Sequence, residues 1–154
     1  TPLHAAIAYK STALVPELLR RCPQLNLAAR DAADRAIIEY AVANDAVDVV
    51  RQLIPAHVPV KYESPQHWRT LLHLAVVYNR PATVAALLEL GADPRAHNDK
   101  GLTPLLLAQK LNLPGCIEVL QKDEQERVNA ALAKVGAAPA ARAAATTAAA
   151  VPAN

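Results

Sequence analysis

The chain has 154 residues, enough for one domain with an apolar core that needs no disulfide. It contains no Phe or Met and a single Trp, so the core must come from Leu, Ile, Val and Ala, which favours packed helices. The formal net charge of +2 is too small to indicate nucleic acid as a partner, and charged residues interrupt the apolar runs, which argues against a membrane-spanning helix. We therefore expect an all-α protein that binds neither nucleic acid nor membrane.

Four segments share one pattern and recur at nearly constant spacing. They begin at residues 1, 36, 70 and 103, so the separations are 35, 34 and 33 positions. A second apolar run follows each start after about a dozen residues, with spacings of one, three and four that place its side chains on one helical stripe. Each repeat is predicted to be a short helix, a tight turn and a second helix.

The boundaries of these helices carry their own chemical signals. Thr1–Pro2 and Thr103–Pro104 each predict a helix start, because Thr can cap the helix and Pro lacks an N–H that would be unpaired there. His4 and His73 follow such starts, where an imidazole can bridge to the Thr hydroxyl or to the backbone of a neighbouring repeat. Gly91–Pro94 predicts the end of the second helix of the third repeat.

These features resemble the ankyrin-repeat family over roughly residues 1–122. The resemblance rests on TPLHAA at 1–6, YAVANDAVDVVRQLI at 40–54, TLLHLAV at 70–76 and LLELGADPRAHNDKGLTPLLLA at 88–108. It implies an all-α solenoid of about four helix-turn-helix repeats, with the repeats near residues 1–30, 31–64, 65–97 and 98–122.

Several positions depart from the family pattern. The second repeat begins Ala36-Ile37-Ile38-Glu39, without Thr, Pro or His, so we expect its first helix to be less well capped. Pro16 is tolerable only in the first turn of a helix, so that helix should begin near Leu14. Three prolines between Ile54 and Thr70 predict an irregular or longer loop, in which Trp68 occupies the family's usual glycine position.

The two ends of the chain differ in character from the repeats. The first residues open directly on the TPLH helix, so we expect the start of the first repeat to be missing. Residues 123–135 carry acidic side chains early and a Lys late, which predicts a helix that caps the stack. Residues 136–154 are almost entirely Ala, Pro and Thr and are expected to form a flexible, disordered tail.

No motif for catalysis, a cofactor or a metal stands out. The chain has no nucleotide-binding loop and no hydrolase or metalloprotease signature. Cys22 and Cys116 form no Cys/His cluster and are interpreted as buried helix thiols. His57, His67 and His97 fall in or near loops one repeat apart, about 10 Å, which is too far for shared ligation. We predict no enzyme activity, no cofactor, no metal and no small-molecule substrate.

The resemblance implies that the partner is another protein, bound on the face formed by the hairpins and the first helices. In the family, the contacting positions are the hairpin tip before each Thr and the exposed end of each first helix. The partner-binding residues that we assign on this basis are Tyr9, Arg35, Asn44, His67, Trp68, Arg69, Tyr78, Asp99, Lys100 and Lys110.

Binding energy should come mainly from the aromatic and Arg members of this set, because such side chains dominate interfaces. For Trp68 the alternative is that the indole folds back onto the stack. We expect a monomeric, cytoplasmic or nuclear protein-interaction module or adaptor. The alternative function is a targeting or regulatory ankyrin segment of a larger enzyme or effector whose catalytic domain lies elsewhere.

Overall fold

The computed structural model describes residues 2–9, 13–22, 29–57, 62 and 70–136. Over these residues the chain forms eight helices and one isolated bridge, between Arg30 and Ala36, and no other strand pairing. The helices are α1 (Pro2–Ala8), α2 (Leu14–Arg21), α3 (Ile37–Ala43), α4 (Val47–His57), α5 (Leu71–Val77), α6 (Pro81–Glu89), α7 (Pro104–Lys110) and α8 (Pro114–Lys134).

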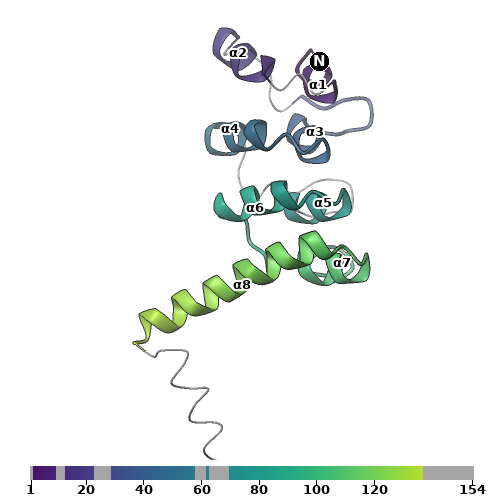
Figure 1. Cartoon of the computed structure of the whole chain (residues 1–154). Coiled ribbons are helices and arrows are strands. Elements are labelled where there is room, and N and C mark those ends of the chain that lie inside the picture. Colours follow the sequence, from purple (N-terminus) through teal and green to yellow (C-terminus); the bar gives the residue numbers. More distant parts are fainter. Residues whose placement is uncertain (1, 10–12, 23–28, 58–61, 63–69, 137–154) are drawn as a thin grey trace, which may run out of the picture. The chain divides into compact units, whose positions relative to one another are not determined.

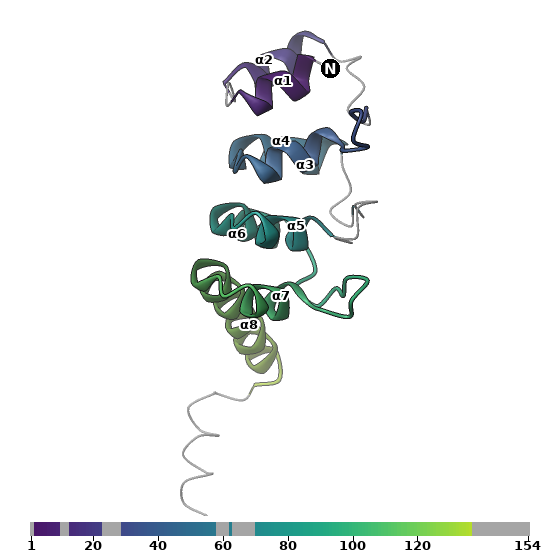
Figure 2. The ribbon, with the colours of Figure 1, turned by 90° about the vertical axis from the view of Figure 1, so that its right-hand side faces the viewer.

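Residues 1–120 form one compact unit, in which the helices stack as pairs (Figures 1 and 2). The first helices α1, α3, α5 and α7 pack successively on one another, and the second helices α2, α4 and α6 form a parallel row beside them. The predicted all-α solenoid of four helix-turn-helix repeats is confirmed.

Aliphatic side chains fill the space between the two rows of helices. Leu3, Ile38 and Leu72 occupy the same position in successive first helices, and all three are almost completely buried. Val50 and Leu87 from the second helices join the same cluster. Full burial of one such side chain stabilises the fold by roughly 1.5–3 kcal/mol, so the core holds neighbouring repeats together.

The turn between the two helices of a repeat uses a residue with positive φ. Asp45, Asn79 and Asn112 occupy this position in the second, third and fourth repeats, with φ values of 58°, 52° and 55°. Asp and Asn tolerate the left-handed region better than other non-glycine residues. The three residues are 34 and 33 positions apart, so the turn repeats with the same period as the helices.

The helix starts follow the predicted chemistry. The Thr70 hydroxyl accepts from the His73 backbone N–H at 3.4 Å, and the Thr103 hydroxyl accepts from the Leu106 N–H at 3.3 Å. Ala36, which precedes α3, makes no side-chain cap, as expected for the second repeat. The predicted start of α2 at Leu14 is also confirmed.

Two expectations need correction, and most of a third concerns residues that the structure does not describe. The loop expected between Ile54 and Thr70 begins later than its first proline, because α4 continues through Pro55 to His57 and a proline removes only one hydrogen bond of the helix. Cys22 is exposed at the end of α2, whereas Cys116 is buried as predicted. Most of the connection that we expected to be irregular, 58–61 and 63–69, lies outside the described residues.

The helix predicted over 123–135 is not a separate element. It continues the second helix of the fourth repeat, so that α8 runs unbroken from Pro114 to Lys134, because no Gly or Pro interrupts residues 116–135. Residues 121–154 form a second compact unit, described by itself. Its helical part is polar, with Arg127 donating to Asp123 at 2.5 Å. Capping of the stack remains a prediction, and all but the first residue of the expected tail, 136–154, lies outside the described residues.

Candidate protein-binding surface

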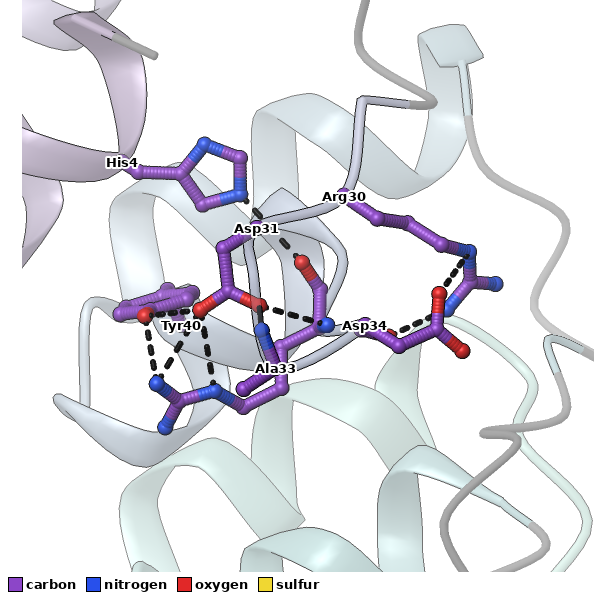
Figure 3. Close-up of polar contacts among 7 residues, drawn as sticks. His4, Arg30, Asp31, Ala33, Asp34 and Tyr40 are labelled. Atoms are coloured by element: carbon purple, nitrogen blue, oxygen red, sulfur yellow. Dashed lines mark hydrogen bonds and ion pairs between the residues drawn. The ribbon is translucent and has the colours of Figure 1, made fainter.

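The hairpin before α3 is built around the carboxylate of Asp31 (Figure 3). One carboxylate oxygen accepts from the backbone N–H groups of Ala33 and Arg35, at 2.9 and 2.8 Å. The other accepts from the Tyr40 hydroxyl at 2.5 Å and from the Arg35 guanidinium at 3.1 Å. The hydrogen bonds from Tyr40 and from the backbone hold the pKa of Asp31 well below its usual range. Asp31 is therefore an ionised structural anchor of this hairpin.

Arg35 is held in place by the same cluster. Its guanidinium donates to the Tyr40 hydroxyl at 2.7 Å and lies 4.6 Å from the centroid of the Tyr40 ring. The His4 ring meets Tyr40 edge-on, with 5.1 Å between centroids, and His4 Nε2 donates to the Arg35 carbonyl at 3.4 Å. The first repeat thus fixes the hairpin of the second, as predicted for His4.

The hairpin before α7 has the same design with different residues. Asn98 takes the place of Asp31, and its side-chain oxygen accepts from the N–H groups of Lys100 and Leu102 at 2.9 and 3.0 Å. His73 Nε2 donates to the Leu102 carbonyl at 2.9 Å, and its Nδ1 accepts from the Thr70 hydroxyl at 2.8 Å. His73 therefore makes both of the predicted bridges, and burial lowers its pKa.

The second repeat carries Glu39 where the first and third repeats carry His4 and His73. Glu39 is only 4% exposed, and its carboxylate accepts from the Tyr62 hydroxyl at 2.8 Å. Burial, together with the Glu39 carboxylate, raises the pKa of Tyr62 to about 12. Glu39 thus joins its repeat to the connection that leads to the third repeat. Sequence reasoning missed this pair, because the motif gives no sign of a partner 23 positions away.

A pocket of about 270 Å³ lies where α3 packs against α5. Its walls come from both repeats and from the turns that follow the two helices. The lining residues are Arg35, Glu39, Tyr40, Ala43, Asn44, Leu74, Tyr78 and Arg80.

Three residues that we assigned to partner binding, Arg35, Asn44 and Tyr78, meet at this pocket. Asn44 donates from its side chain to the Tyr40 carbonyl at 3.0 Å, while Tyr78 is 43% exposed. Arg80 was not predicted. It donates from Nε to the Ala43 carbonyl at 3.0 Å, so it crosses from the third repeat to the second.

The other assigned residues do not join the pocket. Tyr9 is 83% exposed just after α1. Asp99 and Lys100 are exposed in the hairpin before α7, and Lys110 is exposed at the end of that helix. His67, Trp68 and Arg69 lie outside the described residues.

No helix in the described ranges is long and apolar enough to cross a membrane. The same residues bring no three potential metal ligands together. The geometry is that of a surface with a polar pocket, lined by guanidinium, phenol and amide groups.

Known proteins with related sequences are mostly much longer than this chain. This chain is 37% identical over 75 residues to the human 2-5A-dependent ribonuclease. The aligned segment covers 49% of this chain and 10% of the ribonuclease. The chain is 34% identical over 87 residues to palmitoyltransferase ZDHHC17 of Danio rerio, covering 56% of this chain and 14% of that protein. A shorter match, 52% over 40 residues, relates it to NF-kappa-B inhibitor alpha of Sus scrofa, covering 26% of this chain and 13% of the inhibitor.

Structural comparison agrees with the sequence matches. The ankyrin-repeat domain of Bcl-3, a member of the IkappaB protein family, superimposes with a TM-score of 0.68 and 27% identity, over 79% of this chain and 56% of that one. The family model described as ankyrin repeats (3 copies) matches residues 38–131. Ankyrin repeats are protein-interaction modules. With its 33- to 35-residue period, its His-bridged hairpins and these matches, the chain belongs to the ankyrin-repeat family.

Proposed function

We propose that this chain is a non-catalytic module that binds a partner protein through its hairpins and first helices. The pocket between α3 and α5 would be the centre of that face. The observation that carries the proposal is the meeting of Arg35, Asn44 and Tyr78 at one pocket formed by two adjacent repeats. Arg35 and Asn44 are partly exposed and already held by hydrogen bonds, so they lose little conformational freedom when a partner binds.

The exposed chemistry of the two rows of helices differs. The first-helix row presents the phenol rings of Tyr9 and Tyr78, which supply large contact area with few rotatable bonds. The second-helix row presents Arg51 and Glu89, which form an ion pair between α4 and α6 at 2.5 Å. Exposed ion pairs of this kind contribute little binding energy, so the first-helix row is the better candidate for the interface.

Site-specific photocrosslinking tests the proposal. The photoreactive residue p-benzoylphenylalanine would replace Tyr78 or Tyr9 in the 154-residue chain, and the matched control would carry it at Gln52, an exposed position on α4. After irradiation in source cells, we expect the same partner to be crosslinked from both tyrosine positions and not from Gln52. Equal yields from all three positions, or crosslinks from Gln52 alone, would contradict the proposed face.

We place this module in the cytoplasm or nucleus, as a monomer. Both cysteines are free thiols, one exposed and one buried, which suits a reducing compartment. Cell fractionation and light scattering of the purified chain check the two assignments. Recovery in a secretory fraction, or a dimeric mass, would contradict them.

The alternative is an ankyrin segment that targets or regulates a larger enzyme. Two matched relatives are named as a ribonuclease and a palmitoyltransferase, and this chain spans only 10% and 14% of their lengths. An antibody raised against residues 114–134 would report the size of the cellular protein. A product much larger than 16.4 kDa that carries enzyme activity would favour this alternative.

A further inference from the structure

We propose that the pocket between α3 and α5 receives the carboxylate side chain of an Asp or Glu residue of the partner protein. This inference rests on the proposed protein-binding function and adds the chemistry of the contact at its centre. It is carried by the hydrogen-bonding groups that line the pocket and by their existing partners.

Arg80 supplies a positive charge at the pocket. Its Nε donates to the Ala43 carbonyl at 3.0 Å, which fixes the guanidinium against the end of α3. Among the described residues, its two terminal nitrogens have no hydrogen-bond partner and no carboxylate forms an ion pair with it. The side chain is partly buried, and charged groups in that position are normally paired. An anion that enters the pocket would complete this arrangement.

Further donors face the same pocket. Arg35 uses Nε and Nη2 for Asp31 and Tyr40, which leaves Nη1 without a partner in the described part of the chain. The Tyr78 hydroxyl likewise makes no hydrogen bond to a described residue. Two guanidinium groups and a phenol can therefore donate to the same ligand.

The strongest acceptors around the pocket are already in use. The Tyr40 hydroxyl donates to Asp31 and accepts from Arg35. Glu39 is almost completely buried and accepts from Tyr62. Asn44 retains its amide oxygen after donating to the Tyr40 carbonyl, and this oxygen can accept a backbone N–H of the partner. The groups that remain available are mostly donors, so the complementary ligand is an acceptor with negative charge.

Size and geometry favour a single carboxylate side chain. A volume of about 270 Å³ is at or below the lower end of ordinary small-molecule pockets and accommodates one side chain of a partner. Arg binds carboxylates through two parallel N–H groups, and Arg80 has two such groups available.

Nuclear magnetic resonance titration of the 15N-labelled 154-residue chain tests the assignment. The probes are the capped peptide Gly-Leu-Glu-Leu-Gly, the same peptide with Gln in place of Glu, and inorganic phosphate. The readouts are the Nε–H signals of Arg35 and Arg80 and the side-chain amide of Asn44. We expect the Glu peptide to bind about tenfold more tightly than the Gln peptide, because charge-assisted hydrogen bonds are about twice as strong as neutral ones.

Variants of the chain separate the pocket from general charge effects. Tyr78→Phe removes one donor and keeps the ring, and we expect about threefold weaker binding of the Glu peptide. Arg80→Gln should abolish the difference between the Glu and Gln peptides. Arg51→Gln, on α4 and outside the pocket, removes the same charge and should leave that difference unchanged. Circular dichroism verifies that each variant is folded, since Arg80→Gln also loses the bond to Ala43.

Three results would overturn the assignment: equal affinity for the Glu and Gln peptides, the same shifts from phosphate at equal concentration, or equal effects of Arg51→Gln and Arg80→Gln. Photocrosslinking from the Tyr78 position distinguishes these failures from failure of the proposed function. If crosslinks persist while the peptides do not discriminate, the module binds its partner without a carboxylate in the pocket. If the crosslinks are also absent, the proposed face itself is wrong.

Discussion

Replacement of His73 should separate the hairpin before α7 from the third repeat. The imidazole is completely buried and joins the Thr70 hydroxyl to the Leu102 carbonyl. His73→Ala removes both bonds, and a buried polar group left without its partner costs about 1–3 kcal/mol. The cavity adds a comparable cost, so we expect a total loss of about 3–5 kcal/mol in the free energy of unfolding. His73→Gln keeps a donor in place and should cost less.

The same histidine should make stability depend on pH. Burial lowers the pKa of His73, so the unfolded chain takes up its proton at a higher pH than the folded chain does. Protonation would also turn Nδ1, which accepts from Thr70, into a donor. The contribution of the neutral imidazole to the free energy of unfolding is therefore complete above the ordinary pKa of about 6.5. As the pH falls below that value, this contribution decreases by at most about 1.4 kcal/mol per pH unit.

Urea unfolding followed by circular dichroism measures both effects. The original chain, His73→Ala and His73→Gln would be compared at about pH 7.5, 6.5 and 5.5. Other titrating groups contribute equally to all three proteins, so the difference between the original chain and His73→Gln isolates the imidazole. A difference that stays constant across this range, or a cost below about 1 kcal/mol for His73→Ala, would refute the reasoning.

Three further substitutions test local features by the same unfolding measurement. Thr103→Ala removes the cap of α7 and should cost about 1 kcal/mol, whereas a neutral result would show that the cap is dispensable. Gly101→Ala should cost about 1–2 kcal/mol, because the φ of Gly101 is 69° and a residue with a Cβ is strained there, even though no atom blocks the new methyl group. The matched change Asp34→Gly, at a φ of 58°, removes a Cβ from the same backbone region and should therefore add no backbone strain. Glu89→Gln breaks the exposed pair with Arg51 and should cost less than about 1 kcal/mol, an effect that salt reduces; a larger, salt-independent loss would contradict it.

The features that sequence predicted are those that local chemistry determines. Thr103 and Pro104 start a helix, and the Thr side chain bonds within its own first turn. The tight turn predicted inside each repeat is also local, because it is closed by the backbone conformation of single residues such as Asp45 and Asn79. Repetition strengthens these signals, since the same chemistry recurs at each repeat. The fold class and the repeat count could therefore be predicted without a structure.

The features that sequence missed depend on contacts between repeats. Arg80 reaches the Ala43 carbonyl, 37 positions away, and no motif around Arg80 indicates that contact. Tyr62 pairs with Glu39 from a connection without a recognisable pattern. The continuation of α4 through Pro55 was missed for a different reason: a proline signal is ambiguous where a helix has only its last turn left to complete.

Departures from the repeat pattern coincide with the proposed binding centre. The second repeat has Asp34 where the fourth has Gly101, and Ala36 where the third and fourth have a capping Thr. It also has Glu39 where the first and third have His. Each departure gives up a local stabilising feature, and Glu39 lines the pocket itself. Proteins commonly break local rules at functional sites and compensate elsewhere, as the Asp31 cluster does in this hairpin. This coincidence favours the contact region between α3 and α5 as the centre of binding, over the more regular contact region between α5 and α7.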